Sequence, residues 1–320
     1  MLFLIQSHKD PDQLARLVRT LRAGCPDCTV LISHDFRATP LPRATFGGDG
    51  DVHIIQGKGG RGDFTIVDGY LAALRWLRDN KVDYSWVTNL SGQDYPVASL
   101  ANFTRELASA PHDGFLHHSA ELALSRPDGY DRYYFQYRKL KETLSVTERA
   151  LLRVPRVALE RLSAPYRINT SYGLMVGRRA KPAPFNADFR CYAGSYWHTI
   201  RRRCANYLLD FVEEQPALVD YLKRVLVPDE CFFQTVLVNH PGFRFVNDNR
   251  RYFDMRGARH GHPKVMTDDD MPKFVGGRYF FARKFEWSNG TALLDRLDRY
   301  ALGNAGGGRV TPQAAAAPAH

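Results

Sequence analysis

Apolar residues in the first third of the chain alternate between two spacings. Short apolar runs, which are typical of buried strands, occur at residues 2–6, 29–33, 52–55 and 84–90. Between them lie segments with apolar residues at helical spacing, at 12–23 and 65–77. This alternation predicts an α/β fold in which a mainly parallel central sheet is flanked by helices. Ligands of such folds bind beyond the carboxyl ends of the strands.

The rest of the chain is less regular. We expect a helix over 99–109, a strand over 114–118 and a helix over 217–227. The segment CYAGSYW is predicted to lead into a helix that Trp197 opens, and Asp229 is predicted to be the N-cap of a later helix. Residues 303–320 lack periodic apolar positions, so we expect a disordered tail after a folded unit that ends near Leu302.

Composition and charge narrow the function classes. The 320 residues are 44% apolar, and Lys and Arg outnumber Asp and Glu by 44 to 34. The resulting formal charge of +10 attracts phosphates, acidic glycans or anionic lipid headgroups. The basic residues are spread along the chain and no nucleic-acid-binding signature accompanies them, so nucleic acid is not an expected partner.

Cysteine and histidine usage does not favour disulfides or a metal site. The five cysteines are odd in number and loosely spaced, so we expect them to be reduced. The single pair Cys25 and Cys28 cannot complete a tetrahedral zinc site, and a polar turn explains it. The histidine pairs 117–118 and 260/262 lack metal-ligand spacing. No metal ligand is predicted.

The apolar runs also bear on location. All are shorter than the roughly 20 residues of a spanning helix, and the first residues do not resemble a secretory leader, so a cytoplasmic protein is expected. Residues 145–162 are basic and amphipathic, with Pro155 as an interruption. Peripheral contact with an anionic membrane is one interpretation of this segment, and a helical flap packed on its own domain is the other.

Three polar sets directly follow predicted strands. They are Ser7-His8, His34-Asp35 and Ser91-Gly92-Gln93-Asp94. Because ligands bind at the carboxyl ends of parallel strands, all three sets are candidate ligand-binding residues. Asp35 and Asp94 have an alternative role, since aspartate commonly caps turns and helices.

Four longer motifs occur in a characteristic order. They are Asn89-Leu-Ser-Gly-Gln-Asp-Tyr-Pro96, Ala193-Gly-Ser-Tyr-Trp197, Val227-Pro-Asp-Glu-Cys-Phe-Phe233 and Phe281-Ala-Arg-Lys-Phe285. In this order they resemble the core-2/I-branching N-acetylglucosaminyltransferase family, which includes xylosyltransferases and plant glucuronosyltransferases. The resemblance extends over residues 2 to 300. It implies a GT-A-type fold and inverting transfer of a sugar from a UDP donor without a bound metal.

The resemblance also implies a domain plan. We expect one GT-A-like domain over 1–302, with a nucleotide-binding half at 1–110 and an acceptor and catalytic half at 111–302. Eukaryotic members have an amino-terminal anchor and disulfides. Neither feature is predicted from this sequence, so it is interpreted as a bacterial, soluble relative.

Metal-independent transfer requires fixed cations near the departing diphosphate. The family's phosphate-binding lysine corresponds to Lys284, and Arg283 is its neighbour. The second phosphate-binding cation has two candidates, Arg259 and Lys264. Three Asp-x-Asp strings, at 10/12, 49/51 and 268/270, are interpreted as helix starts and a Gly-rich loop rather than metal ligands.

The family's catalytic glutamate corresponds to Glu230. Direct displacement at the anomeric carbon needs a carboxylate that takes the acceptor hydroxyl's proton, and Glu230 is the predicted base. Without the resemblance, a helix-start carboxylate would be the ordinary interpretation of this residue.

The resemblance assigns the other candidate residues to donor and acceptor. His8 and Asp35 match positions near uridine and ribose, and Gln93 and Asp94 line the same edge. Ser195 lies where the family approaches sugar or acceptor. Trp197 is assigned either to stacking on a sugar ring or to the core. Met255 replaces a tryptophan that family members use for the acceptor, so a different acceptor is expected.

The predicted function is therefore inverting, metal-independent transfer of a sugar, foremost N-acetylglucosamine, from a UDP-sugar. The expected acceptor is a hydroxyl of a glycan or glycosylated metabolite, and no cofactor is predicted. Two alternatives stay open. One is a metal-dependent UDP-sugar transferase, and the other is a non-catalytic carbohydrate- or nucleotide-binding protein.

Overall fold

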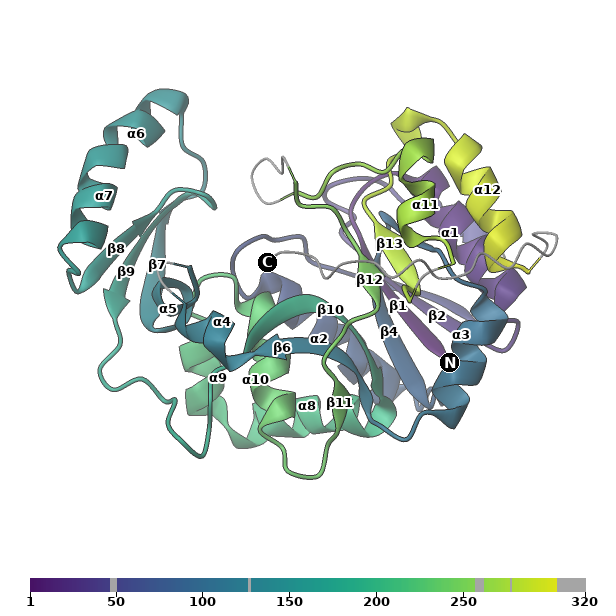
Figure 1. The fold of residues 1–320 in the computed structure, drawn as a ribbon, viewed down its shortest axis with the longest axis horizontal. Coiled ribbons are helices and arrows are strands. Elements are labelled where there is room, and N and C mark those ends of the chain that lie inside the picture. The colour runs from purple at the N-terminus through teal and green to yellow at the C-terminus, as the bar shows by residue number, and fades with distance from the viewer. Residues whose placement is uncertain (47–50, 126–127, 257–261, 277, 304–320) are drawn as a thin grey trace. The chain divides into compact units, whose positions relative to one another are not determined.

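The computed structural model describes residues 1–46, 51–125, 128–256, 262–276 and 278–303 (Figure 1). It divides into two compact units. The first unit combines Met1–Gln56, Thr88–Pro111 and Arg250–His320, and the second combines Gly57–Val87 and His112–Asn249. The chain thus passes between the units repeatedly, whereas the predicted halves 1–110 and 111–302 are each continuous in sequence.

The first unit contains a sheet with strand order β4-β1-β2-β3. Its strands are β1 (Leu2–Ser7), β2 (Thr29–His34), β3 (Val52–Gln56) and the last four residues of β4 (Trp86–Ser91). β2 is parallel to both β1 and β3. Four successive residues of β1 are fully buried, which explains its uninterrupted apolar sequence. The mainly parallel α/β sheet expected of a GT-A-type fold is therefore present.

Helices and a smaller sheet complete this unit. The helices are α1 (Pro11–Gly24), α3 (Leu100–Ser109), α11 (Met271–Phe274) and α12 (Ala292–Ala301), with 3₁₀ turns η1 (Arg43–Phe46), η3 (Asp268–Asp270) and η4 (Trp287–Asn289). The smaller sheet has the order β12-β13-β5, with β12 (Arg251–Tyr252), β13 (Phe281–Arg283) and β5 (Asp94–Pro96). Its pairing sets Arg283 opposite Asp94, which brings two sequence motifs into contact.

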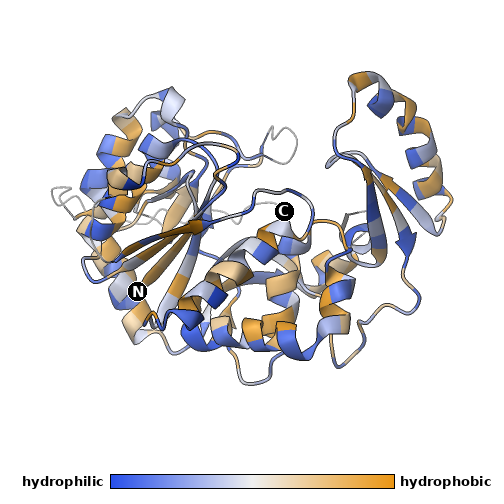
Figure 2. Cartoon of the chain, turned by 180° about the vertical axis from the view of Figure 1, so that it is seen from behind, coloured by the Kyte–Doolittle hydropathy of each residue, from blue (hydrophilic) through white to orange (hydrophobic). Residues whose placement is uncertain are grey.

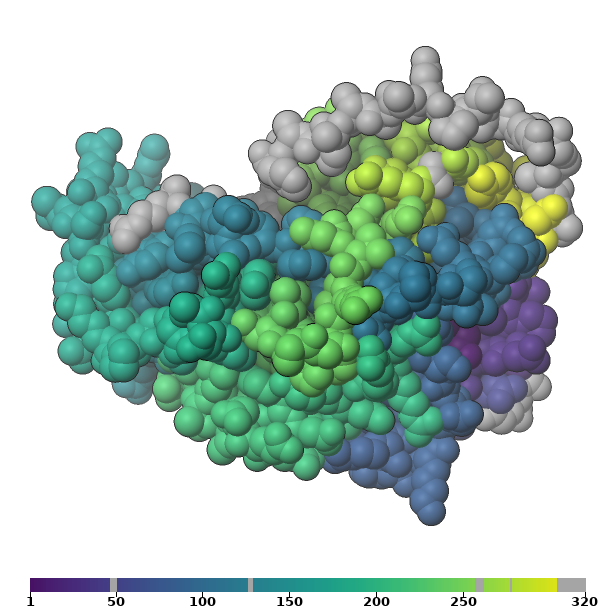
Figure 3. Space-filling view, turned by 60° about the horizontal axis from the view of Figure 1, so that its bottom comes forward, coloured from purple at the N-terminus to yellow at the C-terminus, as the bar shows by residue number. Residues whose placement is uncertain are grey.

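The second unit contains strands in the order β11-β6-β10. These are β11 (Phe245–Val246), β6 (Gly114–Ser119) and β10 (Ala193–Arg201), and β10 is antiparallel to β6. Four of its helices are α2 (Thr65–Asp79), α8 (Arg202–Glu214), α9 (Pro216–Leu222) and α10 (Phe232–Val238). The green surface in Figure 3 includes α8 to α10, and α8 contacts both α9 and α10.

A separate three-stranded sheet of the second unit carries two further helices. Its order is β7-β9-β8, with β7 (Phe135–Lys141), β9 (Leu174–Arg179) and β8 (Tyr166–Asn169). The helices are α6 (Val146–Leu151) and α7 (Arg153–Arg161), and α7 packs on β8. Two short helices precede this sheet, α4 (Ala120–Leu124) and α5 (Asp128–Tyr133).

Two predictions about motif residues are wrong, and the helix expected over 217–227 ends at Leu222. Trp197 lies within β10 instead of opening a helix, because the segment pairs with β6 and α8 begins only at Arg202. Asp229 lies inside a 3₁₀ turn, η2 (Pro228–Glu230), and α10 begins at Phe232 with Cys231 as its N-cap residue. Val227 has a left-handed backbone conformation and Pro228 follows it. The 3₁₀ turn η2 that begins there separates Asp229 from the start of α10.

Among the described residues, none of the helices is long and apolar enough to cross a membrane.

Candidate active site

Three predicted polar sets lie at one edge of the first unit's sheet. Parallel pairing sets Ser7 opposite His34, and the Ser7 hydroxyl lies 2.8 Å from Nδ1 of His34. The amide of Asp35 donates to the carbonyl of Ser7, and the amide of Gly92 donates to the carbonyl of Gln6. The ends of β1, β2 and β4 are therefore joined by backbone hydrogen bonds, as expected for adjacent strand ends.

The carboxylates of these sets also hold local turns together. Asp35 accepts from the Arg37 amide at 3.2 Å and from its guanidinium at 3.0 Å. Asp94 is buried, accepts from the Ser91 amide and forms an ion pair with Arg283. Burial raises the pKa of the Asp94 carboxyl, and the nearby Arg283 charge opposes that rise. The turn-capping role considered from the sequence is present at both residues.

His8 differs because it is exposed. The surrounding protein and then the neighbouring Lys9 ammonium lower the pKa of its imidazole. A neutral imidazole at the end of β1 is able to donate or accept a hydrogen bond.

Lys284, directly after β13, belongs to a charged group that we call the lysine cluster: Lys9, Gln93, Lys284 and Glu286. The Lys284 ammonium lies 2.6 Å from a carboxylate oxygen of Glu286, and Lys9 lies 3.4 Å from the same oxygen. The Gln93 side-chain amide donates to that oxygen at 3.3 Å. Hydrogen bonding from Lys284 lowers the pKa of Glu286 despite partial burial, so this carboxylate is ionised.

Sequence reasoning missed Glu286 and Lys9. Glu286 stands two residues after Lys284, at the end of the string Arg-Lys-Phe-Glu. This proximity to Lys284 was the only sequence signal for it. Lys9 follows His8 directly, but the contact with Glu286 joins residues 277 positions apart. Only tertiary structure brings them together.

Arg251 is a second buried cation that the sequence did not reveal. It stacks over the ring of Phe281 at 4.5 Å and donates to the Asn89 carbonyl at 3.3 Å. Burial lowers the pKa of its guanidinium to about 10, although the Asp94 carboxylate acts in the opposite direction. Of the two candidates for the second phosphate-binding cation, Arg259 lies outside the described residues, and Lys264 is bound to both carboxylate oxygens of Asp270 at 3.1 Å.

In the second unit, Glu230 lies on η2 and contacts Arg132. Their side chains form an ion pair of 2.9 Å, and the Glu230 side chain is 41% exposed. The protein around Glu230 raises the pKa of its carboxyl, and the Arg132 charge opposes that rise. A half-buried carboxylate that solvent still reaches, with a raised pKa, has the chemistry of a general base. No sequence motif had pointed to Arg132.

Asp229 is buried next to Glu230. Burial, and then the charge of Glu230, raises the pKa of the Asp229 carboxyl to about 7. The neighbouring loop carries Asp63, which binds Lys139 at 2.8 Å. These paired groups give the region around Glu230 a mixed charge pattern.

Ser195 and Trp197 lie in an irregular part of β10. The pairing of β10 with β6 shifts register between Gly194 and His198. A Cβ at Gly194 would lie 2.0 Å from the His117 carbonyl, which explains the glycine of this motif. The Gln234 amide donates to the Ser195 carbonyl at 2.6 Å, and Trp197 is half-buried. Met255, the predicted departure in the acceptor region, is exposed.

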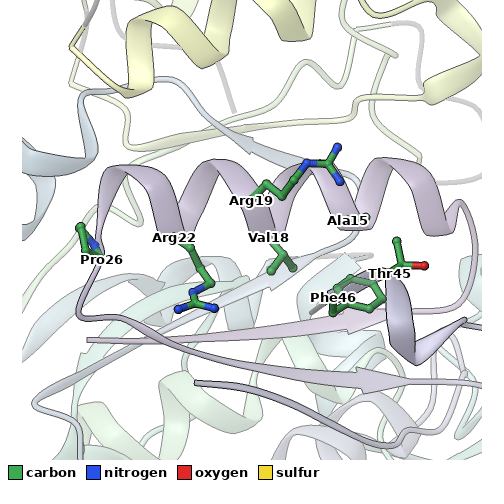
Figure 4. A pocket seen from close by; sticks show the side chains of 7 residues that line it. All are labelled: Ala15, Val18, Arg19, Arg22, Pro26, Thr45 and Phe46. Atoms are coloured by element: carbon green, nitrogen blue, oxygen red, sulfur yellow. The ribbon is translucent and has the colours of Figure 1, made fainter. Parts of the chain in front are cut away.

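A separate cavity lies beside α1. Its volume is about 300 Å³, and Figure 4 shows the side chains that line it: Ala15, Val18, Arg19, Arg22, Pro26, Thr45 and Phe46. The lining includes none of the described residues predicted for the active site, and it supplies no carboxylate to serve as a base. The cavity therefore does not mark the candidate chemistry.

The Asp-x-Asp strings have structural roles where they are described. Asp10 and Asp12 flank the start of α1. Asp270 is buried in η3 and forms ion pairs with Lys264 and Lys273. Asp49 lies outside the described residues. Within the described part of the chain, the structure brings together no group of three or more His, Cys, Asp or Glu side chains suited to hold a metal ion.

With the α/β architecture and the motif positions described, the sequence can be compared with known protein families. The sequence matches the Core-2/I-Branching enzyme family over residues 52–280, and the chain belongs to this family. This match confirms the resemblance found from the ordered motifs.

Curated relatives and solved structures extend the comparison. The beta-glucuronosyltransferase GlcAT14A of Arabidopsis thaliana is 26% identical over 269 residues, covering 82% of this chain and 53% of the relative. Human xylosyltransferase 1 is 24% identical over 267 residues, covering 76% and 24%. The chain thus spans about half the length of the plant relative. The structure of the galactosyltransferase LgtC with donor and acceptor sugar analogs has a TM-score of 0.38 at 12% identity, covering 94% of this chain and 95% of that one.

Proposed function

We propose that the protein is an inverting glycosyltransferase that moves a sugar from a UDP donor to a hydroxyl of a glycan or glycosylated metabolite. The observation that carries the proposal is the half-buried Glu230, which the motif resemblance aligns with the family's catalytic glutamate and whose carboxyl has a raised pKa. Family membership and the transferase names of the curated relatives support the same reaction class.

Glu230 acts as the general base in this proposal. Its carboxylate takes the proton of the acceptor hydroxyl while that oxygen forms a bond to the anomeric carbon. The bond from the anomeric carbon to the UDP oxygen breaks, and UDP departs with the electron pair. Arg132 favours the ionised form of Glu230, so it opposes the premature protonation that burial promotes.

Lys284 stabilises the departing diphosphate. A fixed ammonium in a partly buried setting offsets charge that develops as UDP leaves, and such groups contribute several kcal/mol in enzymes, roughly 3–4 per donor. The Lys284 side chain is 15% exposed, which supports this role because solvent screens it weakly. We propose that no metal ion takes part.

N-Acetylglucosamine is the proposed sugar. The curated relatives are named for glucuronate and xylose, so UDP-N-acetylglucosamine, UDP-glucuronate and UDP-xylose form the donor panel. Faster UDP release with either of the other two donors would contradict the choice of sugar but not the reaction class.

The test is the substitution Glu230→Gln. We expect UDP affinity to be retained, while the transfer rate falls by about 10²–10⁴-fold because the amide cannot accept the proton. Glu121→Gln, an exposed glutamate of the same unit, is the matched control and should leave the rate unchanged. UDP release and UDP binding are measured for both variants. Transfer at the original rate by Glu230→Gln, or absence of UDP release from every form, would contradict the proposal.

A further inference from the structure

Helices α6 and α7 of the second unit present an apolar surface to solvent. Both are described in full, and neither contains a buried residue. Their large apolar side chains are strongly exposed, with Val146 85%, Leu151 72%, Val154 75% and, just after α7, Leu162 78% exposed. Figure 2 shows hydrophobic and hydrophilic stretches side by side along these helices. We call Val146, Leu151, Val154 and Leu162 the apolar stripe.

Helical geometry gathers the apolar stripe on one side. Leu152, between the two helices, keeps a right-handed helical conformation, so the helices follow one another with little change of phase. Val146, Ala150, Val154 and Ala158 recur every four residues and therefore lie along one face. Leu151 and Leu162 flank that face. Two large apolar side chains on this face and two beside it, all more than 70% exposed, exceed what isolated surface residues explain.

The opposite side of the helices is anchored to the unit. α7 packs on β8, and Arg167 donates to the Leu159 carbonyl. Arg149 donates to the Thr170 carbonyl at 2.7 Å. A capping box between Ser145 and Glu148 fixes the start of α6. The apolar stripe is therefore held outward by a built scaffold.

Positive charge accompanies the stripe. The helices carry four arginines against two glutamates, and Glu148 is paired with Lys141 at 2.6 Å. Arg153 and Arg161 are exposed. Because their long side chains reach past neighbouring apolar groups, their guanidinium groups can contact phosphates while the stripe enters an apolar layer.

We propose that α6 and α7 form a docking surface for a bilayer that contains anionic phospholipid. The helices lie in the interface plane, the apolar stripe enters the headgroup boundary, and Arg153 and Arg161 bind lipid phosphates. A second copy of the chain fits less well, since contact would bring these arginines and two chains of charge +10 against each other. This proposal does not rest on the catalytic one, because it involves none of the candidate active-site residues.

The test is flotation of the intact protein with vesicles of phosphatidylcholine, with or without phosphatidylglycerol. We expect binding to the anionic vesicles and at least about tenfold weaker binding to the neutral ones. The paired substitution Arg153→Gln and Arg161→Gln should weaken anionic binding by about tenfold. Leu151→Ser with Val154→Ser should weaken it by about the same factor, because less apolar surface enters the boundary.

A charge-matched control removes two exposed arginines of the first unit, Arg19→Gln and Arg105→Gln, and should retain binding. UDP release by all variants should be unchanged. Equal binding to neutral and anionic vesicles, or equal loss in the control, would overturn the proposal. Light scattering supplies another contrary outcome, namely self-association of the unaltered protein that Leu151→Ser with Val154→Ser abolishes.

Discussion

At the scale of single residues, Glu286 determines the charge environment of Lys284. Its carboxylate lies 2.6 Å from the Lys284 ammonium and 3.4 Å from the Lys9 ammonium. A diphosphate would compete with this carboxylate for the same cations. The Glu286 carboxylate therefore lies where the diphosphate of UDP would contact Lys284.

This arrangement predicts opposite effects for two substitutions. Glu286→Gln should lower the dissociation constant of UDP by about two- to fivefold, because a partly exposed ion pair is worth at most about 1 kcal/mol. Lys284→Met should raise that constant. Isothermal titration calorimetry measures both, and weaker UDP binding by Glu286→Gln would mean that Glu286 positions Lys284 instead of competing for it.

Asp229 predicts a pH dependence of stability. Its pKa in the folded protein is raised to about 7, above the roughly 3.9 of an unfolded chain, so the folded state binds more protons between these values. Stability therefore falls as pH rises through that range. Asp229→Asn carries no charge and should be more stable than the original protein at alkaline pH, by up to roughly 4 kcal/mol.

Urea unfolding at mildly acidic and mildly alkaline pH measures this difference, which should shrink toward pH values of about 4. Asp220→Asn is the control, because the Asp220 side chain is 62% exposed. A constant difference across the range would show that Asp229 stays ionised at every pH.

At the scale of elements, Asp298 joins α12 to α1 and β5. Its carboxylate accepts hydrogen bonds from Arg16 and Thr20 of α1 and from the buried hydroxyl of Tyr95 in β5. Since β5 pairs with β13, these bonds also hold the strand that precedes Lys284. Removal of the acceptor would leave these three groups, which have little access to water, with only the Thr20–Tyr95 hydrogen bond and the Arg16–Asp295 contact among the described residues.

We therefore expect Asp298→Ala to lower the free energy of unfolding by about 2–4 kcal/mol. Asp295→Ala is a matched control, since Asp295 contacts the same Arg16 but its side chain is 51% exposed. Its cost should stay below about 1 kcal/mol. Equal losses in urea unfolding would contradict the assignment of Asp298 as the central acceptor.

The element scale also shows how far the sequence could be interpreted. Strands β1 and β2 and helices α1 and α2 were predicted within one or two residues, because burial of a whole strand or one helix face imposes a clear period. The strand that contains Trp197 was missed. Its pairing partner β6 lies more than seventy residues earlier, and local periodicity contains no information about that partner.

At the scale of the whole molecule, ligand binding should stabilise the fold. A UDP-sugar at a hundred times its dissociation constant adds about 2.7 kcal/mol, which corresponds to a rise in Tm of roughly 5 °C. Because we propose that cations of the chain replace a metal, the rise should be the same with EDTA present. A rise that EDTA abolishes and manganese restores would favour the metal-dependent alternative.

The sequence by itself determined the alternation of strands and helices, the order of the family motifs and the family. These features are written in local spacing and residue type. It did not determine that Glu286 pairs with both Lys284 and Lys9, or that Arg132 pairs with Glu230. Electrostatic partners depend on distances between side chains, and only the tertiary structure sets those distances for residues that lie far apart in the chain.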